Sequence, residues 1–340
     1  MCLSSCGEPI GAPAFRSLHT FDARDEQNVT MTDVADVLED RFTSIRPRLR
    51  SLAYRMLGSF ADADDAVQET WLKASRADIS EVRNLDAWLT TVAGRVCLTM
   101  LRSRRTHGEI SLDASLAPSS DARRSRDTWV PDAVITADET TQVGPEAAAM
   151  ASESVGLAML IVLQALKPDE RLAFVLHDTF AVPFDEIAGI LDTTTAAARQ
   201  LASRARTKVR AAPQPDPDRR RQRTAVDAFF AAARDGDFDG LLRVLHPDVV
   251  LRSDGGALRA SATSVLRGPR AIAGQAMTFT SLSPYRRAAW INGAAGVAIV
   301  GPRGPISVMA FTVTDGRIVE IEVLADPERL ATLLPPELLG

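Results

Sequence analysis

Basic and amide side chains that could contact DNA bases gather on one predicted helix. Residues 193–223 hold nine Arg and Lys residues and two acids, a net charge of +7. An apolar seam with helical spacing runs through the first half of this stretch, and polar side chains flank it: Thr195, Arg199, Gln200, Ser203 and Arg204. Arg and Gln can each form paired hydrogen bonds with a base edge in the major groove. The stretch therefore predicts a DNA-contacting helix.

The residues before this helix predict its partner in a helix-turn-helix motif. Residues 184–191 have a helical apolar pattern, and Asp192-Thr193 form a short turn before the helix that starts at Thr194. Asp192 occupies a turn position where Gly is commoner, and Asp tolerates a left-handed backbone better than most residues. We expect this motif to belong to an all-helical domain of residues 151–212.

A second helical domain, residues 33–106, separates its charges sharply. Its apolar spacing predicts three amphipathic helices. Residues 61–69 carry four acids and no base, whereas residues 87–105 carry four Arg and no acid. The helix dipole accounts for one or two of the acids but not for the whole face. The alternative is two opposed surfaces, an acidic one for a basic protein partner and a basic one for a phosphate backbone.

The chain between the two helical domains, residues 107–150, predicts an acidic linker. Over residues 106–150 there are three Arg and eight acids, a net charge of −5, and periodicity is absent. Such a segment has little prospect of packing. Its one apolar island is Trp129-Val130-Pro131-Asp132. Trp129 is expected either to dock on a neighbouring domain or to bind a partner.

The C-terminal part, residues 224–340, follows a Pro- and Arg-rich hinge at 213–223. It holds eleven Arg and twelve acids, a net charge of −1, so its charge does not indicate DNA binding. Predicted helices at 225–233 and 239–245 precede several predicted strands, which favours an α+β cone around a curved antiparallel sheet. His246 and Asp254 are candidate acid–base residues of an enzyme pocket, but each also fits a turn.

The whole-chain composition narrows the class of protein. The sequence has 340 residues and no apolar run long enough to span a membrane. Its three cysteines, Cys2, Cys6 and Cys97, offer no disulfide framework, which fits a cytoplasmic protein. Residues 1–32 have no secretory pattern and are expected to be a disordered tail or to precede the true start. We expect no cofactor and no metal.

Two segments resemble a known family. Residues 62–74, Asp-Ala-Asp-Asp-Ala-Val-Gln-Glu-Thr-Trp-Leu-Lys-Ala, resemble region 2 of the extracytoplasmic-function (ECF) sigma factors of bacterial RNA polymerase, which belong to the sigma-70 family. Residues 184–210 resemble their region 4. Three further segments, 129–132, 254–257 and 326–330, resemble signatures of the SigJ-type group, which carries a fused C-terminal domain similar to the SnoaL-like, NTF2-like fold. Ala257 and Asp326 depart from those signatures, where Lys and Asn are usual.

The resemblance implies a multidomain fold and a function. The fold comprises two all-α sigma domains, region 2 at 33–106 and region 4 at 151–212, followed by an α+β SnoaL/NTF2-like cone. A sigma factor binds core polymerase, through the clamp of the β' subunit and the flap of the β subunit, and directs recognition of the −10 and −35 promoter elements. The acidic linker would thread a basic polymerase channel.

The resemblance also assigns residues. The polymerase-binding set is Asp62, Asp65, Gln68, Glu69 and Trp71. The −10 set is Asn84, Trp88, Arg95 and Arg102, and the −35 set is Thr195, Arg199, Gln200, Ser203 and Arg204. A regulatory interdomain set is Trp129, Pro131, Asp254, Gly255, Gly256, Asp326 and Pro327.

The fused domain is expected to modulate the sigma domains in cis, so that no separate anti-sigma factor is required. A small ligand of that domain could bias the same equilibrium. Two other functions remain as alternatives: a ligand-sensing helix-turn-helix regulator, and an isomerase- or cyclase-type enzyme. Neither alternative explains both sigma-like motifs.

Overall fold

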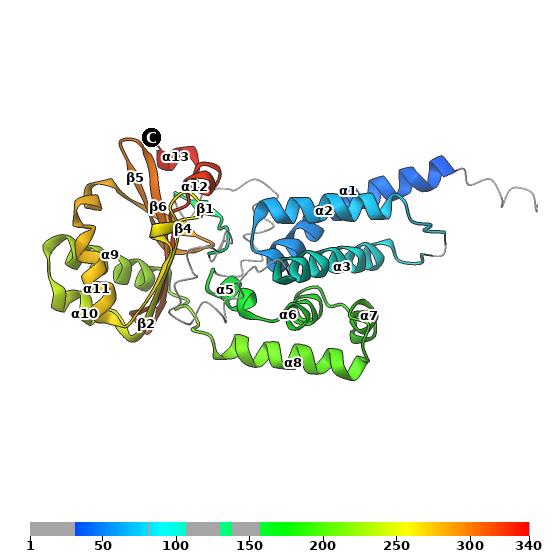
Figure 1. The fold of residues 1–340 in the computed structure, drawn as a ribbon, viewed down its shortest axis with the longest axis horizontal. Helices are drawn as coiled ribbons and strands as arrows, with labels where there is room; N and C mark the ends of the chain where they lie inside the picture. The colour runs from blue at the N-terminus through cyan, green and yellow to red at the C-terminus, as the bar shows by residue number, and fades with distance from the viewer. Residues whose placement is uncertain (1–30, 81, 107–129, 138–156, 340) are drawn as a thin grey trace, which may run out of the picture.

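The computed structural model describes residues 31–80, 82–106, 130–137 and 157–339. The expectations for residues 1–30, for Trp129 and for most of the acidic linker lie outside the described residues. Figure 1 shows helices gathered at one end of the molecule and a curved sheet with its own helices at the other. Within the described part, no helix is both long and apolar enough to cross a membrane.

Three helices form the N-terminal helical unit: α1 (Met31–Leu57), α2 (Phe60–Ala74) and α3 (Leu85–Thr106). Gly58, at φ +78°, ends α1, and the Ser59 side chain then accepts a hydrogen bond from the Asp62 amide and caps α2. Arg41 on α1 forms a two-pronged ion pair with Asp86 on α3. The predicted break at Gly58-Ser59 is confirmed.

The second helical unit comprises α5 (Leu157–Ala165), α6 (Pro168–Phe174), α7 (Phe184–Ile190) and α8 (Thr195–Ala211), with a π-helical turn at Val175–Thr179 after α6. Asp192 lies between α7 and α8 with φ +51°, as its turn position predicted. The Thr194 side chain accepts a hydrogen bond from the Ala197 amide and starts α8. The helix-turn-helix is therefore present.

The two helical units share one apolar core. A Cβ built on Gly94 of α3 would lie 3.4 Å from Leu172 of α6, an ordinary van der Waals distance, so α6 packs directly on this part of α3. The buried Arg171 of α6 donates to the Met56 carbonyl at the end of α1 (2.5 Å) and to the Gln164 carbonyl (2.7 Å). In this arrangement the two units form a single packed body.

The C-terminal domain contains α9 (Arg219–Asp235), α10 (Phe238–Val244) and α11 (Pro269–Thr278) against a seven-stranded sheet, in which the strand order is β1-β4-β5-β6-β7-β2-β3. The strands are β1 (Ile135–Thr136), β2 (Leu245–Asp254), β3 (Ser264–Arg267), β4 (Arg286–Ile291), β5 (Ala294–Gly301), β6 (Gly304–Thr314) and β7 (Arg317–Leu324). Short 3-10 turns lie at Ala260–Ala262 and Thr280–Tyr285. Two short helices, α12 (Pro327–Leu333) and α13 (Pro336–Leu339), end the described chain.

Three expectations need correction. The sheet is not wholly antiparallel, because β2 and β7 pair in parallel. Part of the predicted hinge is helical, because Asp218 accepts hydrogen bonds from two amides in the first turn of α9 and starts that helix at Arg219. The linker is not unpacked throughout, because β1 within it pairs with β4 at the sheet edge.

One charged cluster is buried on the sheet. Arg252 of β2 contacts the carboxylates of Glu322 (2.7 Å) and Glu320 (3.4 Å) of β7. Burial raises the pKa of Glu322 to about 8, against an ordinary value of 4.5; the Arg252 charge opposes this rise, and the neighbouring Glu320 carboxylate adds to it. One arginine is thus shared by two carboxyl groups, of which Glu322 holds its proton near neutral pH.

This cluster predicts a pH dependence of stability. Glu322 binds its proton more tightly in the folded than in the unfolded chain, so its stabilising effect is complete below about pH 4.5 and is lost as the pH rises to about 8. In urea unfolding of the wild type, Glu322 should lower the free energy of unfolding by about 3 kcal/mol between pH 5 and pH 8. The Glu322→Gln variant should not show this decrease. The exposed Glu337→Gln in α13 is the matched control. Equal pH slopes for Glu322→Gln and the wild type would contradict the assignment.

Candidate nucleic-acid interface

The predicted base-contacting residues lie along the outer side of α8. Arg199, Gln200, Ser203 and Arg204 are exposed, and Thr195 in the first turn is half-buried. The apolar seam faces inward, because Ala198, Ala202 and Ala205 are fully buried. Arg199 also stacks over the Phe184 ring of α7, 5.8 Å from its centre. The helix thus presents a row of donors that could enter a groove.

The predicted −10 residues lie on and before α3. Asn84 caps this helix by accepting a hydrogen bond from the Ala87 amide (3.1 Å), and Trp88 is half-buried against the shared core. Arg95 donates to the Gly189 carbonyl of α7 (2.9 Å), and Arg102 forms an ion pair with Asp169 of α6 (3.0 Å). Both arginines therefore contact the second helical unit in this structure.

The acidic side of α2 is partly engaged within the helical body. Asp65, Gln68 and Glu69 are exposed, whereas Asp62 and Trp71 are half-buried. The Trp71 ring lies 5.0 Å from the Phe42 ring, so Trp71 packs on the core. Glu69 pairs with Lys73 one turn along the helix (3.0 Å). Of the predicted polymerase-binding set, the structure brings three side chains to the surface.

Asp132 of the linker joins two parts of the fold. Its carboxylate accepts hydrogen bonds from the Phe60 amide (2.7 Å) and from Arg329 Nε of α12 (2.7 Å). Its carbonyl accepts from the Tyr54 hydroxyl (2.5 Å), and its amide donates to the Gly58 carbonyl (2.8 Å). Asp132 is therefore bonded to the N-terminal helical unit and to the C-terminal domain at once.

Arg329 completes this contact from the other side. Its Nη1 lies 2.9 Å from Asp254 Oδ2 at the end of β2, and its Nη2 donates to the Val130 carbonyl (2.8 Å) and to Asp132. Burial raises the pKa of Asp254, and Arg329 opposes that rise. We name Asp132, Arg329 and Asp254, with their hydrogen bonds, the clasp.

Two glycines allow the predicted regulatory segments to meet at the clasp. A Cβ on Gly256, whose φ is +60°, would lie 2.0 Å from Asp326 Oδ2, and one on Gly255 would lie 2.0 Å from the Arg259 carbonyl. Asp326 caps α12 by accepting hydrogen bonds from the Glu328 and Arg329 amides, and Pro327 is the first residue of that helix. Pro131 is buried, and its two neighbours in the linker, Val130 and Asp132, both contact Arg329.

Arg329, Asp132 and Tyr54, which form these interdomain contacts, were not among the predicted site residues. The signal was present in part: an acid ends the apolar island of the linker, and an arginine lies in the later segment at 326–330. The two segments resemble signatures of the same group and carry opposite charges, Asp132 and Arg329. This combination suggests that the two residues form an ion pair. No local pattern marks Tyr54, which lies in the interior of a helix.

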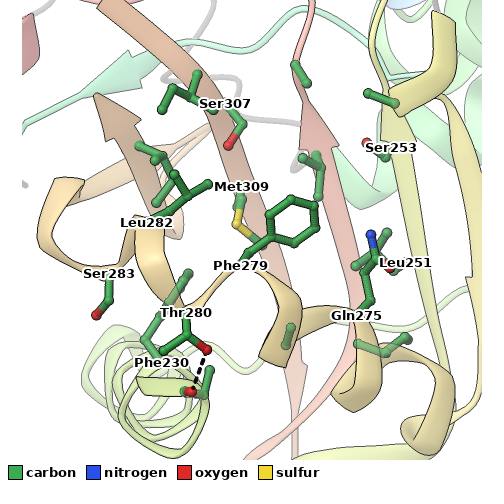
Figure 2. A pocket seen from close by; sticks show the side chains of 18 of the residues that line it. Phe230, Leu251, Ser253, Gln275, Phe279, Thr280, Leu282, Ser283, Ser307 and Met309 are labelled. Carbon is green, nitrogen blue, oxygen red and sulfur yellow. Dashed lines mark hydrogen bonds between the residues drawn. The ribbon is translucent and has the colours of Figure 1, made fainter. Parts of the chain in front are cut away.

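A cavity of about 420 Å³ lies inside the C-terminal domain (Figure 2). No His, Asp or Glu occurs among the described residues that line it. His246 lies at the start of β2, where its Nδ1 accepts from the Asp248 amide, and Asp254 lies at the end of the same strand in the clasp. The structure does not bring these two candidate acid–base residues together.

The chain matches two sigma-70 family models: Sigma-70 region 2 over residues 42–107 and Sigma-70 region 4 over residues 158–209. It is 37% identical to the ECF RNA polymerase sigma factor SigJ of Mycobacterium tuberculosis (strain H37Rv), over 85% of this chain and 91% of that protein. It is 32% identical to the probable ECF RNA polymerase sigma factor SigI of the same species, over 85% of this chain and 93% of that protein.

A solved structure agrees over both helical units and the C-terminal domain. The crystal structure of M. tuberculosis SigJ superimposes with a TM-score of 0.65 at 33% identity, and covers 86% of this chain and 98% of its own. The N-terminal helical unit is therefore region 2, the second helical unit is region 4, and the C-terminal α+β sheet domain is SnoaL-like. The chain belongs to the ECF family of RNA polymerase sigma factors.

Proposed function

We propose that this sigma factor is held by its own C-terminal domain in a closed arrangement that opens when it binds core polymerase. The observation that carries the proposal is the pairing of Arg95 and Arg102 with region 4. Both were predicted to contact the −10 strand. An arginine that donates to Gly189 or Asp169 has fewer donors left for a phosphate. Movement of region 4 away from region 2 would free both side chains for promoter DNA.

The apolar contact between the regions sets most of the cost of opening. Exposed ion pairs such as Arg102 with Asp169 contribute about 0–1 kcal/mol each. Leu172 and Leu176, in contrast, are fully buried and lie against Gly94 of α3. Burying a leucine side chain stabilises by about 1.5–3 kcal/mol. Polymerase can open the factor only by binding the open form more tightly than the closed form.

The clasp connects the C-terminal domain to the equilibrium between the closed and open forms. Through Asp132 and β1 it fixes the linker segment 130–137 between region 2 and the sheet. A linker that threads a polymerase channel, as family resemblance implies, cannot keep these contacts. Releasing the clasp is then a step in loading onto polymerase. A domain that applies this restraint in cis takes the place of a separate anti-sigma factor.

The exposed surfaces fit the remaining partners. Asp65, Gln68 and Glu69 on α2 would meet the basic clamp of the β' subunit, and region 4 would meet the flap of the β subunit. The exposed row on α8 would enter the −35 major groove. The protein would act in the cytoplasm, where the polymerase works. The C-terminal domain would serve regulation and not catalysis, since its described cavity wall offers no acid–base pair.

The first test concerns core binding. Asp65→Arg reverses one exposed charge on α2, and we expect at least a tenfold weaker affinity for purified core polymerase and a matching loss of run-off transcript. Asp239→Arg makes the same charge reversal at an exposed residue of α10, and it should leave the core affinity and the transcript yield unchanged. Equal core affinity of the two variants would refute the docking role of α2.

The second test concerns the clasp. Arg329→Met leaves two buried carboxylates without their cation, a change that costs about 3 kcal/mol and shifts the ratio of closed to open molecules roughly 100-fold. Dyes can be attached at Ser75→Cys and Thr193→Cys in a chain with Cys2 and Cys6 replaced by Ser. Energy transfer between these dyes should be lower in the Arg329→Met variant than in the chain that keeps Arg329. Cys97 is buried with its pKa raised to about 12, so it should escape labelling.

The same variant should raise the yield of run-off transcript when core polymerase is limiting. Arg317→Met, at an exposed residue of β7, is the matched control and should behave as the wild type. Lower transcript from Arg329→Met, with circular dichroism showing a folded chain, would mean that the clasp supports activity and would overturn the restraining role.

A further inference from the structure

The cavity of the C-terminal domain has the size of a small-molecule site. Its volume of about 420 Å³ lies within the range of about 300–1,000 Å³ for ligand pockets. It is enclosed by α9, α11 and the turn at Thr280–Tyr285 on one side, and by the inner face of the sheet on the other (Figure 2). Its walls are mainly apolar, so an apolar ligand would fill it.

Two serine side chains and two phenylalanine rings line different parts of the cavity. Figure 2 shows Phe230 and Thr280 in the lower part of the view and Ser253 and Ser307 in the upper part, with Phe279 between them. Phe279 is 52% exposed although it lines the cavity, so a large ring stands at the cavity mouth. A ligand that covered this ring would bury apolar surface that now faces water.

The cavity wall carries a positive charge that no lining residue neutralises. Among the described lining residues there are two arginines and no acid. Arg234 pairs with Asp235 outside the cavity (2.8 Å). Arg259 uses only Nη1, which lies 3.0 Å from the Ile306 carbonyl and 3.3 Å from the Ala325 carbonyl. The remaining donors of Arg259 are therefore available to an anion.

We propose that this cavity binds a small apolar carboxylate. Its carboxylate would pair with the Arg259 guanidinium and accept hydrogen bonds from Ser253 and Ser307, while its apolar body would lie against Phe230 and Phe279. A guanidinium and a carboxylate match in a planar two-pronged geometry, and such bonds are about twice as strong as neutral ones. The charge of the wall selects the carboxylate over an alcohol or amine of equal length.

Arg259 also connects the cavity to the clasp. It contacts the Ala325 carbonyl, and the Ala325 amide donates to the Asp254 carbonyl (2.7 Å). Asp254 is the clasp carboxylate that Arg329 binds. A ligand that draws Arg259 away from Ala325 would alter the support of Asp254. This regulatory consequence rests on the proposed function, whereas binding itself does not.

The test is calorimetric titration of the full chain with decanoate, decan-1-ol and decylamine below their aggregation concentrations. Decanoate should bind, and the alcohol and amine should bind at least tenfold more weakly. Arg259→Met should weaken decanoate at least tenfold and leave decan-1-ol unchanged. Arg303→Met, an exposed arginine in the turn between β5 and β6, is the matched control and should bind decanoate as the wild type does. Phe279→Ala, at a half-exposed position, should weaken the binding of decanoate and of decan-1-ol alike.

The outcomes separate binding from regulation. No decanoate binding to the wild type, or equal affinity for decanoate and decan-1-ol, would overturn the proposed ligand class. An unchanged decanoate affinity in a folded Arg259→Met variant would overturn the role of Arg259. If decanoate binds as expected but leaves transcript yield unchanged, the binding site stands and its link to the clasp is wrong. An unchanged core affinity of Asp65→Arg, or an unchanged transcript yield of Arg329→Met, would contradict the proposed function and leave this titration unaffected.

Discussion

The arrangement of this sigma factor depends on one buried carboxylate, that of Asp132. Its side chain accepts hydrogen bonds from Phe60 and Arg329, and its backbone bonds to Tyr54 and Gly58. A buried carboxylate is tolerated only where its charge is paired and its oxygens are satisfied. Here region 2 and the C-terminal domain supply those partners together. Removing Arg329 leaves that charge unpaired, and removing the Phe60 amide leaves one carboxylate oxygen without its donor, so the linker couples the two parts.

The sheet extends this coupling because both of its faces are covered over much of β5 and β6. Alternate residues enter different cores: Val297, Ile299 and Phe311 face α9 and α11, whereas Ala298, Val308 and Ala310 belong to the core that is continuous with the helical units. The period of two along a strand produces this division. The strands that line the cavity on one face therefore also support α12 and the clasp on the other.

Local signals in the sequence predicted much of this fold. Helical spacing, the break at Gly58-Ser59 and the turn at Asp192 depend on neighbouring residues, and the structure agrees with each of them. The parallel pairing of β2 with β7 is set by partners about seventy residues apart, and no local pattern encodes it. The pairing of Ile135 with Ile291 across the linker is still more distant. The apolar island at 129–132 predicted either docking on a neighbouring domain or binding of a partner, and no local pattern identified Arg329 as the residue that contacts it.

The contacts of Arg95 and Arg102 with region 4 could not be predicted from a local sequence pattern either. A basic helix end predicts contact with an anion, and the sequence cannot distinguish a DNA phosphate from Asp169 or a helix carbonyl. The structure shows the intramolecular partners, and the predicted DNA contacts require these bonds to exchange. Such an exchange is a two-state change in which the same side chains serve each state in turn.

The central claim, that region 4 covers region 2 until polymerase binds, is tested most directly by amide hydrogen exchange on the full chain, alone and bound to core polymerase. In the free protein, amides of α6 and of the part of α3 around Gly94 should exchange slowly, because the shared core protects them. Binding to core should speed exchange in α6 and at residues 130–137, and slow it in α2. Unchanged protection of α6 and of the linker segment in the complex would contradict the closed arrangement as the state that must open.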